Sequence, residues 1–308
     1  MRILISGSSG FLGKNLQKYI KDNKISHDFL FPSSKAFDCL NIDNMRNYIE
    51  NKKIDVIVHM AAKCGGILAN KNSPADFLRD NTQMGLNIYE CAREYGIQKV
   101  YSLGSVCSYP VNCPTPFKEK DLWNGSPEIT NAAYGQSKRT LLMLSQTYRE
   151  QYGIGGAFFL PANLYGSYDH FDLKNSHVIP ALINKFVNAK EKNIDKVDIW
   201  GDGSPSREFL YAPDLCEAII KAIDLNIDEN EPINIGNGKE VVISDLAETI
   251  KKLVGFEGKI VYTGEVSNGQ PRRRLDVSRA KKILGFKAKT KLEKGLQETI
   301  KYYQSTKI

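Results

Sequence analysis

The sequence lacks several patterns that would assign it to other classes of protein. Its six cysteines are scattered and none forms a Cys-x-x-Cys pair, which argues against a zinc site and against a redox dithiol. No stretch approaches the roughly 20 apolar residues that a membrane-spanning helix needs. The apolar opening is too short for a signal peptide and runs straight into glycine. These absences predict a cytoplasmic protein with free thiols, with no metal site and no membrane partner.

A concentrated run of positive charge is also missing. The 308 residues include 42 lysines and arginines against 35 acidic residues, and the net charge is +7. A nucleic-acid-binding protein would usually concentrate that excess in one run. The densest cluster, at residues 272–274, is three arginines, which suit a small phosphorylated ligand or a solvated loop. We therefore expect no nucleic-acid partner.

Apolar runs alternate with amphipathic helical runs through the first half of the chain. Strands are predicted at residues 2–6, 27–31, 56–60, 100–103 and 156–160, and helices at 14–23, 44–50, 77–95 and 132–152. This alternation predicts an α/β fold with a Rossmann-like, doubly wound parallel sheet covered by helices on both faces. Residues 106–130 contain four prolines and predict a long functional loop.

The second half of the chain has a looser pattern. Short helices are predicted at residues 177–188, 214–225, 243–254, 278–284 and 292–303, with turn-rich segments at 200–205 and 233–238. We predict a dinucleotide-binding domain over residues 1–165, with a returning segment at about 208–235, and a smaller C-terminal α/β substrate-binding cap within 166–308. Doubly wound sheets bind ligands at the carboxyl ends of their strands, so the cap would close on the cofactor.

A glycine turn at residues 7–13 lies between the first predicted strand and the first predicted helix. Gly7 permits the tight turn, Gly10 lets the backbone approach a pyrophosphate, and Gly13 lets the helix pack closely. Backbone N–H groups at the helix N-terminus would then face the phosphates. A purely structural turn is the alternative, but the strand before it and the helix after it favour a dinucleotide site. The contacts expected from this turn are Gly7, Ser9, Gly10, Phe11 and Leu12.

The end of the second predicted strand indicates which dinucleotide is bound. NAD-binding proteins usually place an acid there for the ribose hydroxyls. This chain has no carboxylate in residues 31–35 and instead offers Ser33 and Lys35, which can hold a ribose phosphate. We therefore expect NADP(H) rather than NAD.

Tyr134 and Lys138 are four positions apart and share one face of a predicted helix. A free tyrosine has a pKa near ~10, and an ammonium about 4 Å away supplies the roughly 4 kcal/mol needed to bring it near 7. Ser105 follows the strand at 100–103 and can hydrogen-bond a substrate oxygen. Tyrosine and lysine often share a helix face for packing alone, but the glycine turn and Ser105 favour hydride chemistry in which Tyr134 protonates an alkoxide.

The glycine spacing, taken with the Tyr-x-x-x-Lys motif, resembles the extended short-chain dehydrogenase/reductase superfamily. The resemblance implies that Asp38 contacts the adenine amino group and that Ala61 belongs to the adenosine pocket. Lys138 would also hold the ribose of the cofactor.

Segments over nearly the whole chain resemble the GDP-L-fucose synthase family, at residues 61–67, 104–110, 161–166, 176–182 and 200–210. That family epimerises carbons 3 and 5 of GDP-4-keto-6-deoxymannose and reduces carbon 4 with NADPH. The resemblance implies Cys107 as the base and His177 as the acid of the epimerisation, since a thiol and an imidazole exchange protons near neutral pH. His177 would also contact the cofactor. The substrate contacts that we expect are Ser105, Val106, Asn163, Lys185, Trp200, Arg207 and Arg273.

Departures from the family pattern leave other functions open. Val106 and Ser108 flank Cys107, where the family usually has serine and isoleucine. These changes allow a pure carbon-4 reductase of a GDP-4-keto-6-deoxy-heptose, without epimerase activity. An NAD-dependent 4-epimerase or 4,6-dehydratase and a non-enzymatic dinucleotide sensor are further alternatives. Dehydratases of this fold place an acid pair after a threonine where this chain has Val106 and Cys107, which argues against a dehydratase. Sensors can lose the serine, tyrosine or lysine, and this chain keeps all three, which argues against a sensor. By analogy with relatives, we expect a homodimer through the helices at 77–95 and 132–152.

Overall fold

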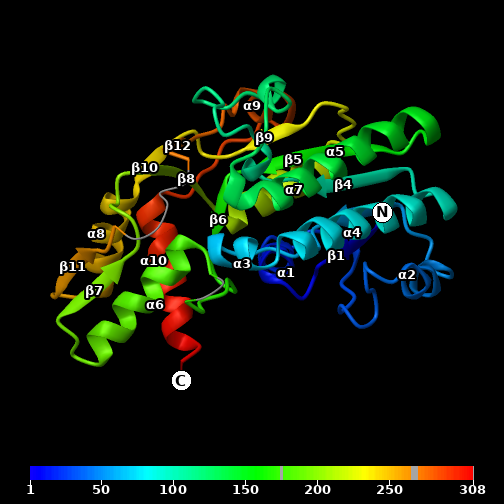
Figure 1. The fold of residues 1–308 in the computed structure, drawn as a ribbon. Helices are drawn as coiled ribbons and strands as arrows, with labels where there is room; N and C mark the ends of the chain where they lie inside the picture. The colour runs from blue at the N-terminus through cyan, green and yellow to red at the C-terminus, as the bar shows by residue number, and fades with distance from the viewer. Residues whose placement is uncertain (174–175, 265–269, 308) are drawn as a thin grey trace.

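The computed structural model describes residues 1–173, 176–264 and 270–307, and a central sheet of six parallel strands organises its larger lobe (Figure 1). The strand order is β2-β1-β3-β4-β5-β9. The strands are β1 (Arg2–Ser6), β2 (Asp28–Leu30), β3 (Val56–His59), β4 (Lys99–Leu103), β5 (Gly155–Pro161) and β9 (Ile233–Ile235). After β1 the chain adds β2 on one side and then crosses over to add β3 on the other side of β1, so the direction in which strands are added reverses at β1. The predicted doubly wound parallel sheet is confirmed.

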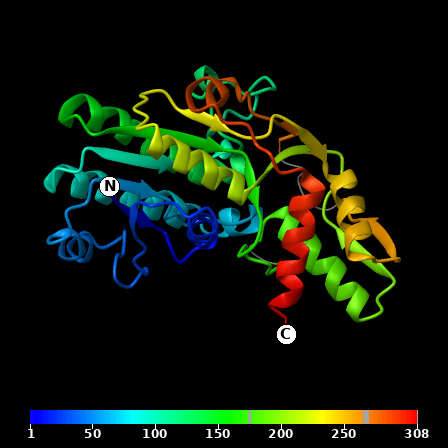
Figure 2. The ribbon, with the colours of Figure 1, turned by 180° about the vertical axis from the view of Figure 1, so that it is seen from behind.

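Helices cover both faces of this sheet, which explains why its strands are nearly continuous in apolar residues. On one face, α1 (Phe11–Asp22) packs against α7 (Ala212–Asp224), and on the other α4 (Pro74–Glu94) packs against α5 (Ala132–Tyr152) (Figures 1 and 2). Helix α2 (Ile42–Ile49) contacts α4. Ile3, Leu4 and Ile5 of β1 are completely buried between these layers.

A smaller lobe is built around a second apolar core. Its central strand, β8 (Ser206–Tyr211), pairs with β6 (Asn163–Tyr165), β10 (Glu240–Val242) and β12 (Arg272–Arg273), while β7 (Lys196–Ile199) pairs with β11 (Lys259–Tyr262). Around these strands lie α6 (Val178–Glu191), α8 (Ile243–Val254) and α10 (Leu292–Ser305). The segment that follows β8 returns to the larger lobe as α7 and β9, and α9 (Ser278–Leu284) packs on β9.

The strand predicted at 2–6 and the helices predicted at 132–152, 243–254 and 278–284 have the observed bounds, and the other predicted helices and strands differ by a few residues at their ends. The pattern missed α3 (Ile67–Asn72) and the strands of the smaller lobe. The segment at 233–238, predicted as turn-rich, begins with β9, an edge strand of the large sheet. Strands of two to six residues show too few alternations to separate them from turns.

The long loop predicted at 106–130 is ordered by α5. It contains three single-turn 3₁₀ helices, η1 (Val106–Ser108), η2 (Glu119–Asp121) and η3 (Ile129–Asn131). The guanidinium of Arg139 on α5 donates to the carbonyl oxygen of Ser108 at 2.8 Å, of Leu122 at 2.6 Å and of Gly125 at 2.8 Å. One buried cation therefore satisfies carbonyl groups from three parts of the loop, and it places η1 beside the end of β4. Within the described residues, no helix is long and apolar enough to cross a bilayer.

Candidate functional site

A cavity of about 900 Å³ opens between the two lobes, at the carboxyl ends of β1, β3 and β4. This is the edge of the sheet, next to the reversal of strand order, where doubly wound folds bind ligands. The predicted site residues that line it are Gly7, Ser9, Gly10, Phe11, Leu12, Ala61, Ser105, Val106, Cys107, Tyr134, Lys138, Asn163, His177, Lys185, Trp200, Arg207 and Arg273. The structure thus brings residues from almost the whole chain around one volume.

Three predicted cofactor contacts do not line this cavity. Ser33, Lys35 and Asp38 lie exposed in the turn that follows β2. The Asp38 carboxylate accepts the backbone N–H of Leu40 at 3.0 Å, and Leu40 itself does line the cavity. The turn therefore lies next to the cavity, with these three side chains outside its walls.

The glycine turn has the shape that a dinucleotide needs. Gly7 has a φ of +71°, and a Cβ placed on it would lie 2.7 Å from the backbone nitrogen of Ala61. A Cβ on Gly13 would lie 2.4 Å from the carbonyl oxygen of Gly7. A Cβ on Gly10 would lie 3.3 Å from the same oxygen, so this position is less crowded. Gly10 is the N-cap of α1 and provides no side-chain cap. The first-turn N–H groups of α1 are therefore available to a phosphate at the cavity wall.

Ser105, Tyr134 and Lys138, here called the tyrosine cluster, meet at the floor of the cavity. The hydroxyl oxygen of Ser105 accepts the backbone N–H of Cys107 at 3.1 Å, which caps η1. The Tyr134 hydroxyl lies beside this serine, and Lys138 Nζ lies 5.8 Å from the centre of the tyrosine ring. The Lys138 ammonium also donates to the carbonyl oxygen of Leu103 at 3.0 Å.

The prediction that Lys138 brings the pKa of Tyr134 near neutrality is wrong for this structure. Burial, followed by the charges of Cys64 and Cys107, raises the pKa of Tyr134 well above 10. Burial also lowers the pKa of Lys138 to about 8. Desolvation outweighs the attraction of the ammonium because both groups are enclosed. Tyr134 is therefore held as a neutral phenol, which is the form that donates a proton.

The predicted acid and base both line the cavity, but each has a neighbour that the sequence did not indicate. The guanidinium of Arg273 donates to Cys107 Sγ at 3.4 Å. His177, at the N-cap of α6, lies with its Nε2 3.6 Å from the sulfur of Cys64. Cys64 was missed as a site residue, although its position directly after the adenosine-pocket strand places it at a carboxyl strand end.

Arg207 and Arg273, here called the arginine pair, form a positive wall of the cavity. Burial, and next the charge of Arg273, lowers the pKa of Arg207 to about 10. Arg273 is itself only 6% exposed. Two enclosed guanidinium groups that repel one another favour the binding of an anion between them, and a diphosphate offers several oxygens to their N–H groups.

The remaining predicted substrate contacts lie along the smaller lobe. Lys185 Nζ lies 5.2 Å from the centre of the Trp200 ring and donates to the carbonyl oxygen of Asp198 at 2.7 Å. Trp200 is 49% exposed, so its ring can take a further flat partner. The Asn163 amide donates to the carbonyl oxygen of Glu208 at 2.8 Å, which holds β6 beside β8.

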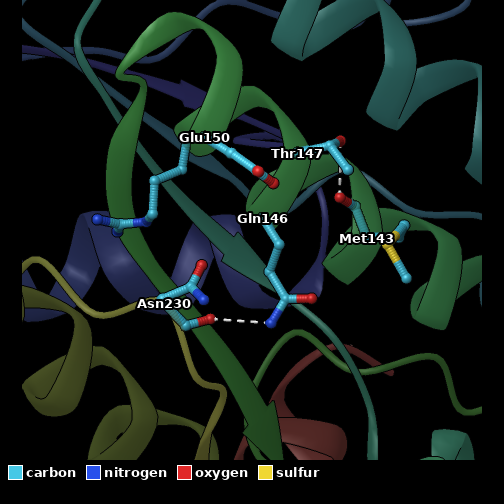
Figure 3. A pocket seen from close by; sticks show the side chains of 6 residues that line it. Met143, Gln146, Thr147, Glu150 and Asn230 are labelled. Atoms are coloured by element: carbon cyan, nitrogen blue, oxygen red, sulfur yellow. Dashed lines mark hydrogen bonds between the residues drawn. The ribbon is translucent and has the colours of Figure 1, made fainter.

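A second hollow, of about 390 Å³, lies along the outer side of α5 (Figure 3). Gln146 reaches across it and donates to the carbonyl oxygen of Asn230 at 3.2 Å. None of the predicted site residues lines this hollow. Among the described residues, no group of three or more His, Cys, Asp or Glu side chains is arranged to hold a metal ion.

The fold and the cavity together define a Rossmann-type oxidoreductase of the short-chain dehydrogenase/reductase class. The feature that defines this class is the tyrosine cluster in the same cavity as the glycine turn at residues 7–13. The chain belongs to the NAD dependent epimerase/dehydratase family, whose model matches residues 3–236.

Individual relatives agree with this assignment. The chain is 37% identical to the GDP-L-colitose synthase of Yersinia pseudotuberculosis, over 100% of this chain and 99% of that protein. A GDP-6-OMe-4-keto-L-xylo-heptose reductase from C. jejuni matches with a TM-score of 0.91 and 26% identity, over 99% of this chain and 98% of that one. An NADP-bound GDP-L-fucose synthetase from Naegleria fowleri matches with a TM-score of 0.91 and 28% identity, over 99% and 93%. The resemblance to GDP-L-fucose synthases is confirmed.

The buried ammonium of Lys138 predicts a pH-dependent stability. The pKa of the folded lysine, about 8, lies below its ordinary value of 10.5. The unfolded state therefore binds more protons between these two pH values, and the free energy of unfolding rises with pH through this range. Lys138→Met lacks this titration. Between pH 7 and 10, we expect the parent to gain about 2 kcal/mol relative to the variant in urea denaturation. Parallel stability curves would contradict a buried lysine of lowered pKa.

Proposed function

We propose that the protein uses NADPH to reduce the carbon-4 ketone of a GDP-linked 4-keto-6-deoxy sugar, either a hexose or a heptose. The observation that carries this proposal is the cavity that brings together the glycine turn, the tyrosine cluster and the arginine pair. The relatives support it, since all three are named for enzymes of GDP-linked sugars.

The residues around the glycine turn fit a bound NADPH. Side chains at Gly7 and Gly13 would collide with the backbone, whereas the uncapped N-terminus of α1 presents N–H groups to a pyrophosphate. The exposed turn after β2 offers Ser33 and Lys35 to a ribose phosphate, and Asp38 to the adenine. NADPH, when bound, supplies the hydride. The NADP in the solved structure of the Naegleria fowleri relative supports this choice of cofactor.

The tyrosine cluster would complete the reduction by moving a proton. Ser105 and Tyr134 hydrogen-bond the carbon-4 oxygen, and Tyr134 gives its proton to that oxygen as the ketone becomes an alcohol. The arginine pair binds the diphosphate, which fixes the distance from the nucleotide to the reacting carbon. Trp200, half exposed at the rim of the cavity, offers its ring to the guanine base.

Loss of the Tyr134 hydroxyl should remove turnover without removing the fold. We expect Tyr134→Phe to lower kcat for NADPH oxidation with GDP-4-keto-6-deoxymannose by about 100-fold or more, because a positioned proton donor is worth this much. The phenyl ring keeps the packing against Phe77, so the melting temperature serves as the control for folding. Product analysis by NMR over a panel of GDP-keto hexoses and heptoses identifies the sugar. Full turnover by Tyr134→Phe would exclude the proposed role.

We also propose that the protein epimerises carbons 3 and 5 of the sugar, with Cys107 as the base and His177 as the acid. Both side chains line the cavity with the tyrosine cluster, and a carbon-4 ketone acidifies the protons on both of these carbons. The alternative is reduction without epimerisation, and the heptose reductase among the relatives supports it.

Exchange in heavy water separates these two possibilities. An epimerase should place deuterium at carbons 3 and 5 without NADPH, and Cys107→Ser should lower that exchange by about 100-fold. Cys113→Ser is the matched control, because Cys113 does not line the cavity. If the parent enzyme reduces the sugar but introduces no deuterium, it is a pure carbon-4 reductase.

We further propose a cytoplasmic homodimer. Helices α4 and α5 pack side by side. Leu86 on α4 is 37% exposed and Met143 on α5 is 47% exposed, and a second copy of the chain could cover these apolar side chains. All six cysteines are free, as a reducing compartment would keep them. Light scattering should give twice the mass of the chain, and we expect Leu86→Lys with Met143→Lys to yield monomers. A monomeric parent at micromolar concentration would contradict the dimer.

A further inference from the structure

Buried amide side chains hold the backbone on both sides of Cys64, in the loop that follows β3. Asn81 Oδ1 accepts the backbone N–H of Lys63 at 2.9 Å, and its Nδ2 donates to the carbonyl of the same residue at 3.0 Å. Asn70 donates to the carbonyl oxygens of the two glycines that follow Cys64, at 2.9 and 3.0 Å. Asn70 and Asn81 are 4% and 3% exposed. The thiol of Cys64 therefore occupies a defined position in the cavity wall.

In this position, Cys64 contacts two side chains that handle protons in the proposed reaction. Its sulfur lies 3.6 Å from Nε2 of His177 and also lies beside the hydroxyl of Tyr134. The three groups come from the β3 loop, from the start of α6 and from α5. Cys64 is exposed and lines the cavity between the two lobes.

The contact between Cys64 and His177 changes the proton affinity of both groups. Enclosure alone would raise the pKa of the Cys64 thiol, but the hydrogen bond and charge of His177 outweigh it and lower that pKa. Enclosure alone would lower the pKa of His177, but Cys64, and then Asp169, raise it to about 9. The contact therefore favours the thiolate over the thiol and the imidazolium over the imidazole.

Other charged groups face the pair and act on it more weakly. The Lys138 ammonium favours the thiolate, whereas Asp169 and Cys107 favour the imidazolium. Asp169 is itself enclosed and faces His170 as well. The Cys64 charge also raises the pKa of Tyr134, second only to burial. A single sulfur thus acts on the two groups in the same direction.

We propose that Cys64 is a positioning residue that keeps His177 and Tyr134 in their proton-donating forms. This inference rests on the proposed function, in which Tyr134 protonates the carbon-4 oxygen and His177 protonates a sugar carbon. A negative sulfur in contact with both groups favours the imidazolium over the imidazole and the phenol over the phenolate. It therefore opposes the effect that the neighbouring Lys138 has on the phenol.

The proton balance of the pair is simple. When His177 protonates a carbon, one of its ring N–H bonds breaks and a C–H bond forms, which leaves a neutral imidazole beside a thiolate. No electrons leave the pair. It recovers one proton from water, and the imidazolium forms again before the next turnover.

Titration of the histidine rings by NMR tests the pairing without any substrate. The chain has 4 histidines, and His177→Asn identifies the His177 resonances. We expect a midpoint near 9 in the parent. In Cys64→Ala and in the nearly isosteric Cys64→Ser, we expect it to fall by about one pH unit or more. In Cys64→Asp, which restores a negative group, we expect it to stay above that of Cys64→Ala. An unchanged midpoint in Cys64→Ala and Cys64→Ser overturns the proposal.

Alkylation of the thiol gives a second readout from the other member of the pair. We expect iodoacetamide to modify Cys64 at pH 7 in the parent, and about tenfold more slowly in His177→Asn, because only the thiolate reacts. Cys113, whose pKa burial raises to about 12, is the internal control that stays slow in both proteins. Equal Cys64 rates in the two proteins would count against the pair.

Activity separates this inference from the proposed function. If the parent does not reduce any GDP-4-keto sugar, the proposed function fails, and the His177 midpoint still decides whether the pair exists. If the parent is active, the pH dependence of proton transfer to the sugar carbons is compared between the parent and Cys64→Ala. As the pH rises, we expect Cys64→Ala to lose this transfer at least one pH unit below the pH at which the parent loses it. Cys113→Ser should keep the pH profile of the parent. If Cys64→Ala is active and has the pH profile of the parent, the role of Cys64 is contradicted while the proposed reduction is not.

Discussion

Enclosure of a few ionisable side chains in a cavity is the constraint on which the chemistry of this structure depends. Tyr134 and Lys138 are only 9% and 4% exposed, and burial is the largest influence on the pKa of each. Groups that are shielded from water respond mainly to their nearest neighbours, so a few contacts decide which of them carries a proton. In this structure the pKa of the Tyr134 phenol is raised and that of the His177 imidazole is raised to about 9, so both groups favour their protonated forms. Reduction of a ketone requires a proton donor of this kind at its oxygen.

The cavity keeps its shape because buried polar side chains hold the loops around it. The hydroxyl oxygen of Ser6 on β1 accepts hydrogen bonds from the backbone N–H groups of Met60 and Ala61, at 3.1 and 3.2 Å. These bonds hold the start of the loop that follows β3. Asn81 holds the next part of this loop, and Arg139 holds the long loop that carries η1. Each of these bonds gives a backbone group of the loops a partner within the protein. Specific hydrogen bonds therefore hold the loops that carry Cys64 and Cys107 to the rest of the larger lobe.

Sequence patterns predicted the central sheet well because strands covered on both faces are apolar throughout and the helices between them are long. They predicted the tyrosine cluster for a similar local reason, since a spacing of four on a helix places Tyr134 and Lys138 on one face. The smaller lobe was harder, because strands such as β12, with two residues, leave almost no pattern. Cys64 escaped notice because its partner, His177, is 113 positions away and their contact arises only when the two lobes meet.

The sequence by itself determined the doubly wound fold, the glycine turn and the placement of Tyr134 and Lys138 on one helix face, because these depend on local spacing and on the periodicity of apolar residues. Only the tertiary structure decided their protonation. The spacing of Tyr134 and Lys138 predicted an acidified phenol, whereas burial and the thiol of Cys64 raise its pKa. Desolvation and charge depend on every atom within a few ångströms, and those atoms come from segments that are far apart in the chain.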